Sequence, residues 1–199
     1  MTFFEKISNA IPRFLLYAIV ALVQVALVVV MVVDRARILR EGAEVTLQTR
    51  PIDPRDFLRG DYVVLNYDIS SVAAGELKDR PASGRATVVY VKLAPKGDGF
   101  HQAVSVHGEP VAIAPGEALI QGRVARGTEC GATRRAFCDR LQINYGLERY
   151  FVPEGEGREI ESARNQGKVS IVAAVTSGGR AAIKRLLLDG KPVYYEPTF

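Results

Sequence analysis

The sequence predicts a mostly β domain, an antiparallel barrel or sandwich with one short helix, preceded by a single transmembrane α-helix. Two observations support this fold class. An uncharged apolar stretch occupies residues 14–33, near the N-terminus. After residue 43, short segments of alternating apolar and polar residues are separated by turns that contain Gly or Pro. This second pattern is typical of antiparallel strands joined by short connections.

The apolar stretch at 14–33 reads FLLYAIVALVQVALVVVMVV, and Gln24 is its only strongly polar residue. At about 1.5 Å per residue it spans roughly 30 Å, which matches the hydrocarbon core of a bilayer. It is longer than the apolar core of a signal peptide, and Asp-Arg-Ala-Arg at 34–37 is not a small-residue cleavage site. We therefore expect an uncleaved anchor in the lipid bilayer.

The anchor divides the chain into four parts. We expect a short cytoplasmic tail at 1–13, the transmembrane helix at 14–33, the end of a juxtamembrane helix at 34–43, and a β-rich extracytoplasmic domain at 44–199. Gly42 should end the helix. Basic residues flank both sides of the span, so the flanking charges do not decide its orientation.

The two cysteines of the chain, Cys130 and Cys138, lie between the alternating segments 118–126 and 140–145. A hairpin whose loop is closed by a disulfide fits this arrangement, because paired strands bring Cα atoms to about 5.5 Å. Such a bond persists in an oxidising compartment such as a periplasm. Two free thiols are the alternative, and a metal site is a third. The pair therefore favours a single-pass protein with the bulk of its chain in such an oxidising compartment.

The strands of the domain follow from period-two alternation and from β-branched and aromatic residues. The segment 181–188 also has helical propensity, but the Gly-Gly turn at 178–179 favours a hairpin with 169–175. The expected strands are 44–50, 62–69, 87–93, 100–106, 118–126, 140–145, 148–152, 169–175, 181–188 and 192–195, with a short helix at 157–165.

The segment 51–67, PIDPRDFLRGDYVVLNY, is the most unusual part of the domain. Its two prolines fix φ, and Gly60 permits a left-handed turn, so a rigid loop should lead into a strand. Asp61 is suited to capping that turn. On the strand, Val63, Leu65 and Tyr67 should face one side of the sheet, and the residues between them the other.

At residues 60–67 the sequence spells Gly-Asp-Tyr-x-x-Leu-x-Tyr, and this segment resembles the signature of the bacterial GDYXXLXY protein family. The segment at 148–155, ERYFVPEG, resembles that family as well, as does the layout of one anchor helix and a β-rich domain. The resemblance implies a membrane-anchored protein of a family often encoded beside multi-span membrane proteins. Together with the cysteine pair, it leads us to expect a single-pass protein of the bacterial inner membrane with the bulk of its chain in the periplasm. The candidate motif and binding residues are Pro51, Asp53, Arg55, Asp56, Arg59, Gly60, Asp61, Tyr62, Leu65, Tyr67, Glu148, Tyr150 and Pro153.

A weaker resemblance links Arg-Gly-Asp-Tyr-Val-Val-Leu at 59–65, and Ile-Lys-Arg-Leu at 183–186, to type I signal peptidases. Those enzymes use a Ser nucleophile with a Lys general base. The matching region of this chain, 44–57, contains no serine and offers only Thr46 and Thr49. Since an active pair needs both members within hydrogen-bond reach, we predict no catalytic residue.

The net charge and the histidine content argue against nucleic-acid binding and metal binding. A net charge of +4, from 26 basic and 22 acidic residues, is too weak a bias to suggest a nucleic-acid binder. His101 and His107 would share one strand face if the strand were unbroken, but they lack a third ligand, and we expect no metal and no cofactor.

We therefore expect a binding or regulatory module for an integral membrane-protein partner. The alternative is an envelope hydrolase that uses Asp53, Asp56 and Asp61 with Lys184, which requires these groups to converge in one pocket.

Overall fold

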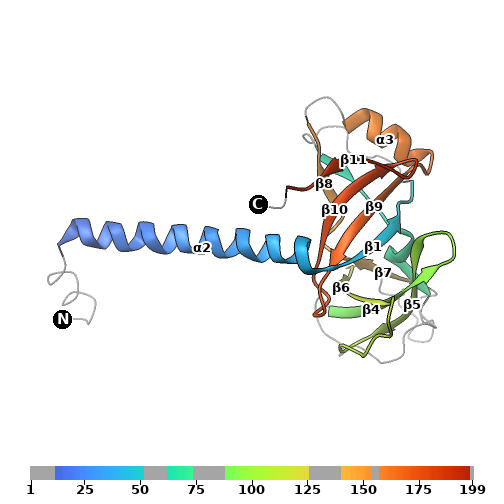
Figure 1. The fold of residues 1–199 in the computed structure, drawn as a ribbon, viewed down its shortest axis with the longest axis horizontal. Helices are drawn as coiled ribbons and strands as arrows, with labels where there is room; N and C mark the ends of the chain where they lie inside the picture. Colours follow the sequence, from blue (N-terminus) through green and yellow to red (C-terminus); the bar gives the residue numbers. More distant parts are fainter. Residues whose placement is uncertain (1–11, 52–61, 74–87, 126–139, 154–156, 198–199) are drawn as a thin grey trace, which may run out of the picture. The chain divides into compact units, whose positions relative to one another are not determined.

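The computed structural model describes residues 12–51, 62–73, 88–125, 140–153 and 157–197 (Figure 1). The chain divides near Arg37 into an N-terminal helical unit and a β domain that begins at Ile38.

Helix α2 (Arg13–Glu41) contains the predicted span. Its most apolar part has a mean hydropathy of 2.9, and none of that part is buried by the protein. A helix that is apolar on all faces and exposed is suited to lipid, because its backbone groups are satisfied internally. Helix α2 is therefore long and apolar enough to cross a membrane.

Gly42 ends the helix, as the sequence predicts, and its N–H donates to the Ile38 carbonyl at 3.0 Å. The position requires glycine because the chain passes very close to the end of strand β9 (Val169–Val175). A Cβ at Gly42 would lie 2.6 Å from the Ile38 oxygen and 2.8 Å from the Val175 nitrogen. Close approach, and not an unusual φ, explains the residue here.

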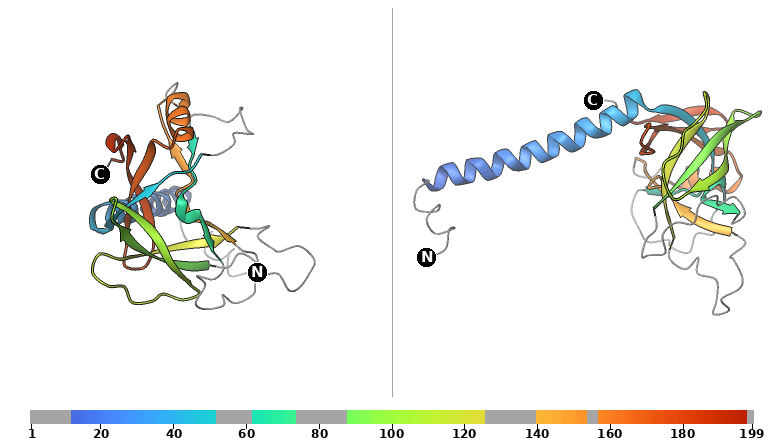
Figure 2. Two further views of the ribbon diagram at one scale, coloured as in Figure 1. Left: turned by 90° about the vertical axis from the view of Figure 1, so that its right-hand side faces the viewer. Right: turned by 90° about the horizontal axis from the view of Figure 1, so that it is seen from below.

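The described strands form three antiparallel sheets that curve around a common core into a nearly closed barrel (Figures 1 and 2). Their orders are β1-β9-β10-β11, β2-β8 and β3-β7-β6-β4-β5. This confirms the predicted mostly β, antiparallel fold. The elements are β1 (Ala43–Gln48), β2 (Tyr62–Val64), the 3-10 turn η1 (Asp68–Ser70), β3 (Ser71–Ala73), β4 (Val88–Lys96), β5 (Phe100–His107), β6 (Ala118–Val124), β7 (Arg140–Asn144), β8 (Arg149–Phe151), helix α3 (Gly157–Asn165), β9 (Val169–Val175), β10 (Ala181–Leu188) and β11 (Lys191–Tyr195).

Single backbone contacts join the sheets to one another. Thr49, just after β1, forms an isolated bridge with Tyr67. The turn between β9 and β10 meets β6 at a position that β7 does not pair with, where the Gln121 N–H donates to the Gly179 carbonyl at 2.8 Å. Gly179 has φ +85°, and a Cβ there would lie 3.1 Å from the Gln121 nitrogen, so both conformation and space require glycine.

Strand β9 is buried along its whole length, because it lies between β1 and β10 and is covered on both faces. Its residues Val169, Ile171, Ala173 and Val175 face the main core. Its Ala174 packs on the other side in a small cluster, together with Ile38, Leu39 and Ala182. A continuous apolar run such as VSIVAAV is the pattern expected of a strand covered on both faces.

The expected strand at 62–69 is wrong in its second half, and β3 is missing from the predicted set. The chain instead turns at η1, because the Tyr67 N–H donates to Ser70 Oγ at 3.2 Å and the Ser70 N–H donates to the Tyr67 carbonyl at 3.0 Å. A serine hydroxyl competes with strand pairing in this way. The predicted alternation is confirmed nonetheless, since Val63, Leu65 and Tyr67 are all buried.

The remaining expected elements are confirmed with small changes at their ends. Helix α3, β9 and β10 have the predicted bounds, and β9 and β10 form the predicted hairpin across the Gly-Gly turn. Strands β4 and β5 form a hairpin, and β6 pairs with β7, as expected.

Candidate functional site: a tyrosine clasp and a polar cleft

The two segments that carry the motif lie far apart in the sequence, and the structure pairs them. Strands β2 and β8 are antiparallel, with Val63 opposite Tyr150 and Val64 opposite Arg149. The pairing continues past β2, where the Leu65 N–H donates to the Glu148 carbonyl at 2.8 Å. The described parts of the two motif segments, 62–67 and 148–153, are therefore joined by this strand pairing.

Two buried tyrosines, Tyr67 and Tyr145, join the two chain segments next to this strand pair, and we call the arrangement the tyrosine clasp. The Tyr67 hydroxyl donates to the Leu147 carbonyl at 2.5 Å, and the Tyr145 hydroxyl donates to the Ile69 carbonyl at 2.7 Å. The Glu148 carboxylate accepts the Tyr145 N–H at 2.5 Å. Each tyrosine thus bonds to the backbone beside the other, so residues 67–69 and 145–148 are joined twice.

The electrostatics of the clasp keep both phenols protonated. Burial raises the pKa of Tyr67 and of Tyr145 well above the usual value, and the nearby Glu148 carboxylate raises each pKa further. A neutral phenol is a hydrogen-bond donor, which is what both backbone carbonyls need. The clasp is therefore a structural device, because its hydroxyls are sealed from solvent and already used.

Several predicted site residues belong to this core. Leu65 and Tyr67 are buried, and so is Tyr150, whose ring centroid lies 6.3 Å from that of Tyr194. Burial, followed by the charge of Glu196, raises the pKa of Tyr150 to about 12. These side chains pack inside the domain, so we do not place them in a binding surface.

Other predicted residues are exposed or lie outside the described part of the chain. Pro51 and Pro153 are exposed. Of Tyr62 only the backbone, in β2, is described. The predicted disulfide lies outside the described residues and stays a prediction. Also outside them are Asp53, Arg55, Asp56, Arg59, Gly60, Asp61, Cys130 and Cys138.

A buried arginine attaches helix α3 to β2, and the sequence did not reveal it. The side chain of Arg164 is 1% exposed and donates from Nη1 to the Val64 carbonyl at 2.5 Å. Its Nε and Nη2 both donate to Asn165 Oδ1, at 3.3 and 3.1 Å. Burial lowers the pKa of Arg164, and Glu161 opposes that shift. The available signal was spacing, since Arg164 follows buried Ile160 by four positions on the same helix face.

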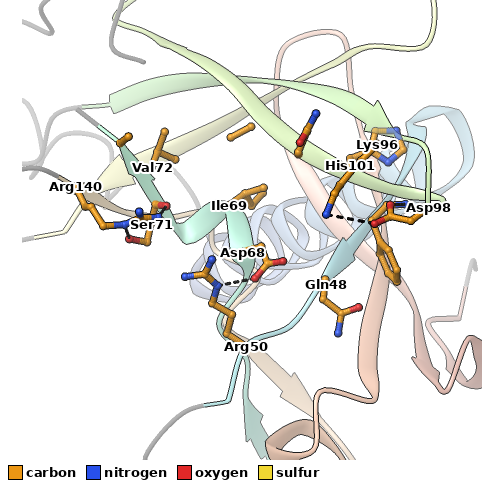
Figure 3. Close-up of a pocket in the computed structure, with 14 residues that line it drawn as sticks. Gln48, Arg50, Asp68, Ile69, Ser71, Val72, Lys96, Asp98, His101 and Arg140 are labelled. Carbon is orange, nitrogen blue, oxygen red and sulfur yellow. Dashed lines mark hydrogen bonds and ion pairs between the residues drawn. The ribbon is translucent and has the colours of Figure 1, made fainter. Parts of the chain in front are cut away.

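An open cleft of about 430 Å³ lies beside η1 and β3, the segment that follows Tyr67 in the chain (Figure 3). Its walls come from the end of β1, from η1, from β3, from the β4–β5 hairpin and from the start of β7. Strands β3 and β5 are the two edge strands of the five-stranded sheet. The cleft is thus the place where the two edges of this curved sheet approach each other, and residues far apart in sequence meet there.

Charged side chains line the cleft, and most are paired. Arg50 Nε lies 2.5 Å from Asp68 Oδ1, and Lys96 Nζ lies 3.3 Å from Asp98 Oδ2 (Figure 3). A hydrogen bond from the Phe100 N–H, together with Lys96, lowers the pKa of Asp98. The Arg50–Asp68 pair is about half exposed, so it contributes little to stability.

His101 closes the gap between β1 and β5 at the cleft. Its Nδ1 accepts the Thr46 N–H at 3.2 Å, so the ring stands in for a backbone partner along the edge of β1. Burial lowers the pKa of His101, against a smaller opposing effect of the Thr46 hydrogen bond. This bond requires an unprotonated Nδ1, which the lowered pKa favours.

His107 does not share a face with His101, although both lie on β5. Opposite β4, Ser105 pairs with Lys92 but Ala103 pairs with Leu93, so Val104 is an extra residue that forms a bulge. A bulge exchanges the two faces of a strand beyond it. Within the described residues no group of three or more His, Cys, Asp or Glu is arranged to bind a metal.

Lys184, the base that the hydrolase alternative needs, is already paired. Its Nζ lies 3.0 Å from Glu44 Oε1, and Arg185 pairs with the same carboxylate. The hydrogen bond from Lys184 is the largest effect on the pKa of Glu44 and lowers it; burial opposes that shift, and the charge of Arg185 adds to the lowering. Lys184 is thus held as the ion-pair partner of a carboxylate and is not aimed at an open site, as a general base has to be.

These features define a class of protein. It has an N-terminal helix long and apolar enough to span a membrane, followed in the sequence by a nearly closed antiparallel β domain whose two motif segments are paired. The family model described as GDYXXLXY protein matches residues 24–186, which is most of the chain. The chain belongs to the GDYXXLXY family, as the motif residues indicate. No curated protein and no solved structure matches the chain.

Proposed function

We propose that this protein is a membrane-anchored, non-enzymatic module that binds an integral membrane-protein partner through the cleft between β3 and β5. The helix at 14–33 anchors it in the bacterial inner membrane, and the β domain lies in the periplasm. The observation that carries the proposal is the cleft itself, where charged side chains are positioned by mutual pairing and remain open to solvent.

The chemistry of the cleft favours recognition. A volume of about 430 Å³ is within the usual range of binding pockets. Ile69 and Val72 also line the cleft but are only 3% and 2% exposed, so its open surface is mainly charged and polar and offers polar specificity. Because the charged side chains are held by one another, less freedom is lost when a partner binds, which lowers the entropic cost of binding.

The same groups are poorly suited to catalysis. Asp68 and Asp98 each face a cation, and the Nδ1 of His101 accepts a backbone N–H. A general base needs a free acceptor aimed at a proton, and a nucleophile needs such a base beside it. We therefore place the envelope hydrolase second, since Lys184 is engaged by Glu44.

Site-specific photo-crosslinking in native membranes tests the proposal. Gln102 lies on the cleft wall and is exposed, so a photo-reactive phenylalanine at this position should capture one partner of defined mass. Glu109 is also exposed but does not line the cleft, and the same replacement there is the matched control.

The expected result is a discrete adduct from position 102 and none, or a much weaker one, from position 109. Identification of the adduct as a multi-span membrane protein supports the proposal. Capture of the same mixture from both positions, or of nothing from position 102, overturns it.

A further inference from the structure

The cleft contains one basic side chain, Arg140, whose hydrogen-bond partners differ from those of Arg50 and Lys96. Arg140, at the start of β7, donates from Nε to Ser71 Oγ at 2.7 Å and from Nη2 to the Ser71 carbonyl at 2.6 Å (Figure 3). Both oxygens are uncharged. Arg50 and Lys96, by contrast, each face a carboxylate, and among the described residues no carboxylate forms an ion pair with Arg140.

The two bonds to Ser71 use one edge of the guanidinium and fix its plane. A guanidinium has five N–H donors, and the remaining ones stay available at an exposed side chain that lines the cleft. An arginine held along one edge loses little further freedom when it binds a ligand with its other edge. Ser71 is thus a positioning residue, and Arg140 is the group that would contact a ligand.

We propose that Arg140 binds a carboxylate of the partner polypeptide, presented by an acidic side chain or a chain terminus, and that Ser71 orients it. This inference rests on the proposed function and names the chemistry of its ligand. The planar fork of arginine matches a carboxylate through two parallel hydrogen bonds.

The first experiment adds substitutions to the chain that carries the photo-reactive residue at position 102. Arg140→Gln should lower the yield of the partner adduct about tenfold or more, because a hydrogen-bonded charge is lost. Arg140→Lys, which retains the charge without the fork, should give an intermediate yield, and so should Ser71→Ala. Arg123→Gln, at an exposed arginine of β6 outside the cleft, should leave the yield unchanged.

The outcomes separate this inference from the proposed function. If the original chain captures the partner and Arg140→Gln captures it equally well, the carboxylate inference is overturned and the binding module stands. If the original chain captures nothing, the proposed function fails, and the second experiment decides the anion site alone. A thermal midpoint for Arg140→Gln within a few degrees of the original chain excludes misfolding as the cause of a loss.

The second experiment uses small probes on the full chain in detergent micelles, with arginine side chains labelled with 15N. N-acetylaspartate amide, N-acetylasparagine amide and methyl phosphate are titrated separately at one ionic strength. The Arg140 signal, assigned by its absence in Arg140→Lys, should shift with the aspartate probe and not with the asparagine probe. No shift with the aspartate probe overturns the inference, and tighter saturation by methyl phosphate reassigns the site to a phosphate source and overturns the polypeptide carboxylate.

Discussion

The tyrosine clasp and the cleft lie on the same short stretch of chain and are built in opposite ways. In the clasp, the Ile69 carbonyl accepts a buried phenol, and Tyr67 donates to Leu147. In the cleft, Asp68 and Ser71 pair with exposed arginines. Buried neutral hydrogen bonds are costly to break, because water cannot replace them, whereas exposed ion pairs contribute little to stability. The clasp is therefore suited to maintaining the fold, and the cleft to making contacts.

The shared element η1 connects the two regions. The backbone of Ile69 is bound from one side by Tyr145, while its side chain and Asp68 line the cleft on the other. A wall fixed by buried bonds changes shape little when a ligand binds. The family motif thus contributes to a binding site indirectly, because Leu65 and Tyr67 support the wall that the ligand would meet.

The largest effect should come from the clasp. Tyr67→Phe removes the donor to the buried Leu147 carbonyl and should lower the free energy of unfolding by about 1–3 kcal/mol. Tyr145→Phe should cost a similar amount, because it leaves the Ile69 carbonyl without its donor. Urea unfolding of the full chain in micelles, followed by tyrosine fluorescence, measures both, since the chain has no tryptophan.

Tyr195→Phe is the matched control, because Tyr195 is 64% exposed, and it should change stability negligibly. A double variant of Tyr67 and Tyr145 should depart from additivity, since both bonds join the same two segments. Equal stability of Tyr67→Phe and Tyr195→Phe would contradict the structural role of the clasp.

A smaller effect should come from His101, at the border between core and cleft. Its pKa in the folded protein is lowered, so the unfolded chain binds the proton more readily. The stabilising contribution of the neutral ring is complete above the unfolded pKa of about 6.5 and is lost as pH falls through the lowered folded pKa. Loss of the Thr46 hydrogen bond should cost about 0.5–1 kcal/mol, because the ring is partly exposed.

Unfolding measured from pH 7.5 to pH 5 checks this, with His101→Gln and His107→Gln compared in parallel. The pH dependence should flatten in His101→Gln more than in His107→Gln. An unchanged slope in His101→Gln would refute a role for this ring in joining β1 to β5.

The smallest effect should come from the exposed pair in the cleft. Asp68→Asn removes the carboxylate beside Arg50 and should change the free energy of unfolding by about 0.2–1 kcal/mol. The difference should shrink further in high salt, because exposed charges are screened. A loss as large as that of Tyr67→Phe would mean that the cleft, too, maintains the fold, and the comparison would fail.

The sequence predicted elements better than it predicted sites. The apolar run at 169–175 and the Gly-Gly turn at 178–179 located β9 and β10, and the short helix predicted at 157–165 is α3, all with the bounds that the structure has. The strand expected at 62–69 failed at Tyr67, where a serine three residues later turned the chain. Propensity and alternation do not register such a local side-chain bond.

The candidate site was less predictable for the same physical reason. Two tyrosines of the sequence, Tyr67 and Tyr145, gave no sign that each would bond beside the other. The sequence analysis did not single out Arg164, which is buried. His101 and His107 would have shared one face of an unbroken strand, but a bulge at Val104 separates them.

By itself, the sequence determined the apolar helix, most of the strands, the turn glycines and membership of the family, because each depends on residues close together in the chain. Only the tertiary structure decided that β2 pairs with β8, that Arg164 is buried, and that Arg50, Ser71 and Arg140 meet in one cleft. Pairing between distant strands depends on the register of the whole sheet and on the core that all strands share. Local sequence patterns do not specify that register, so the residues of the cleft could be identified only from the tertiary structure.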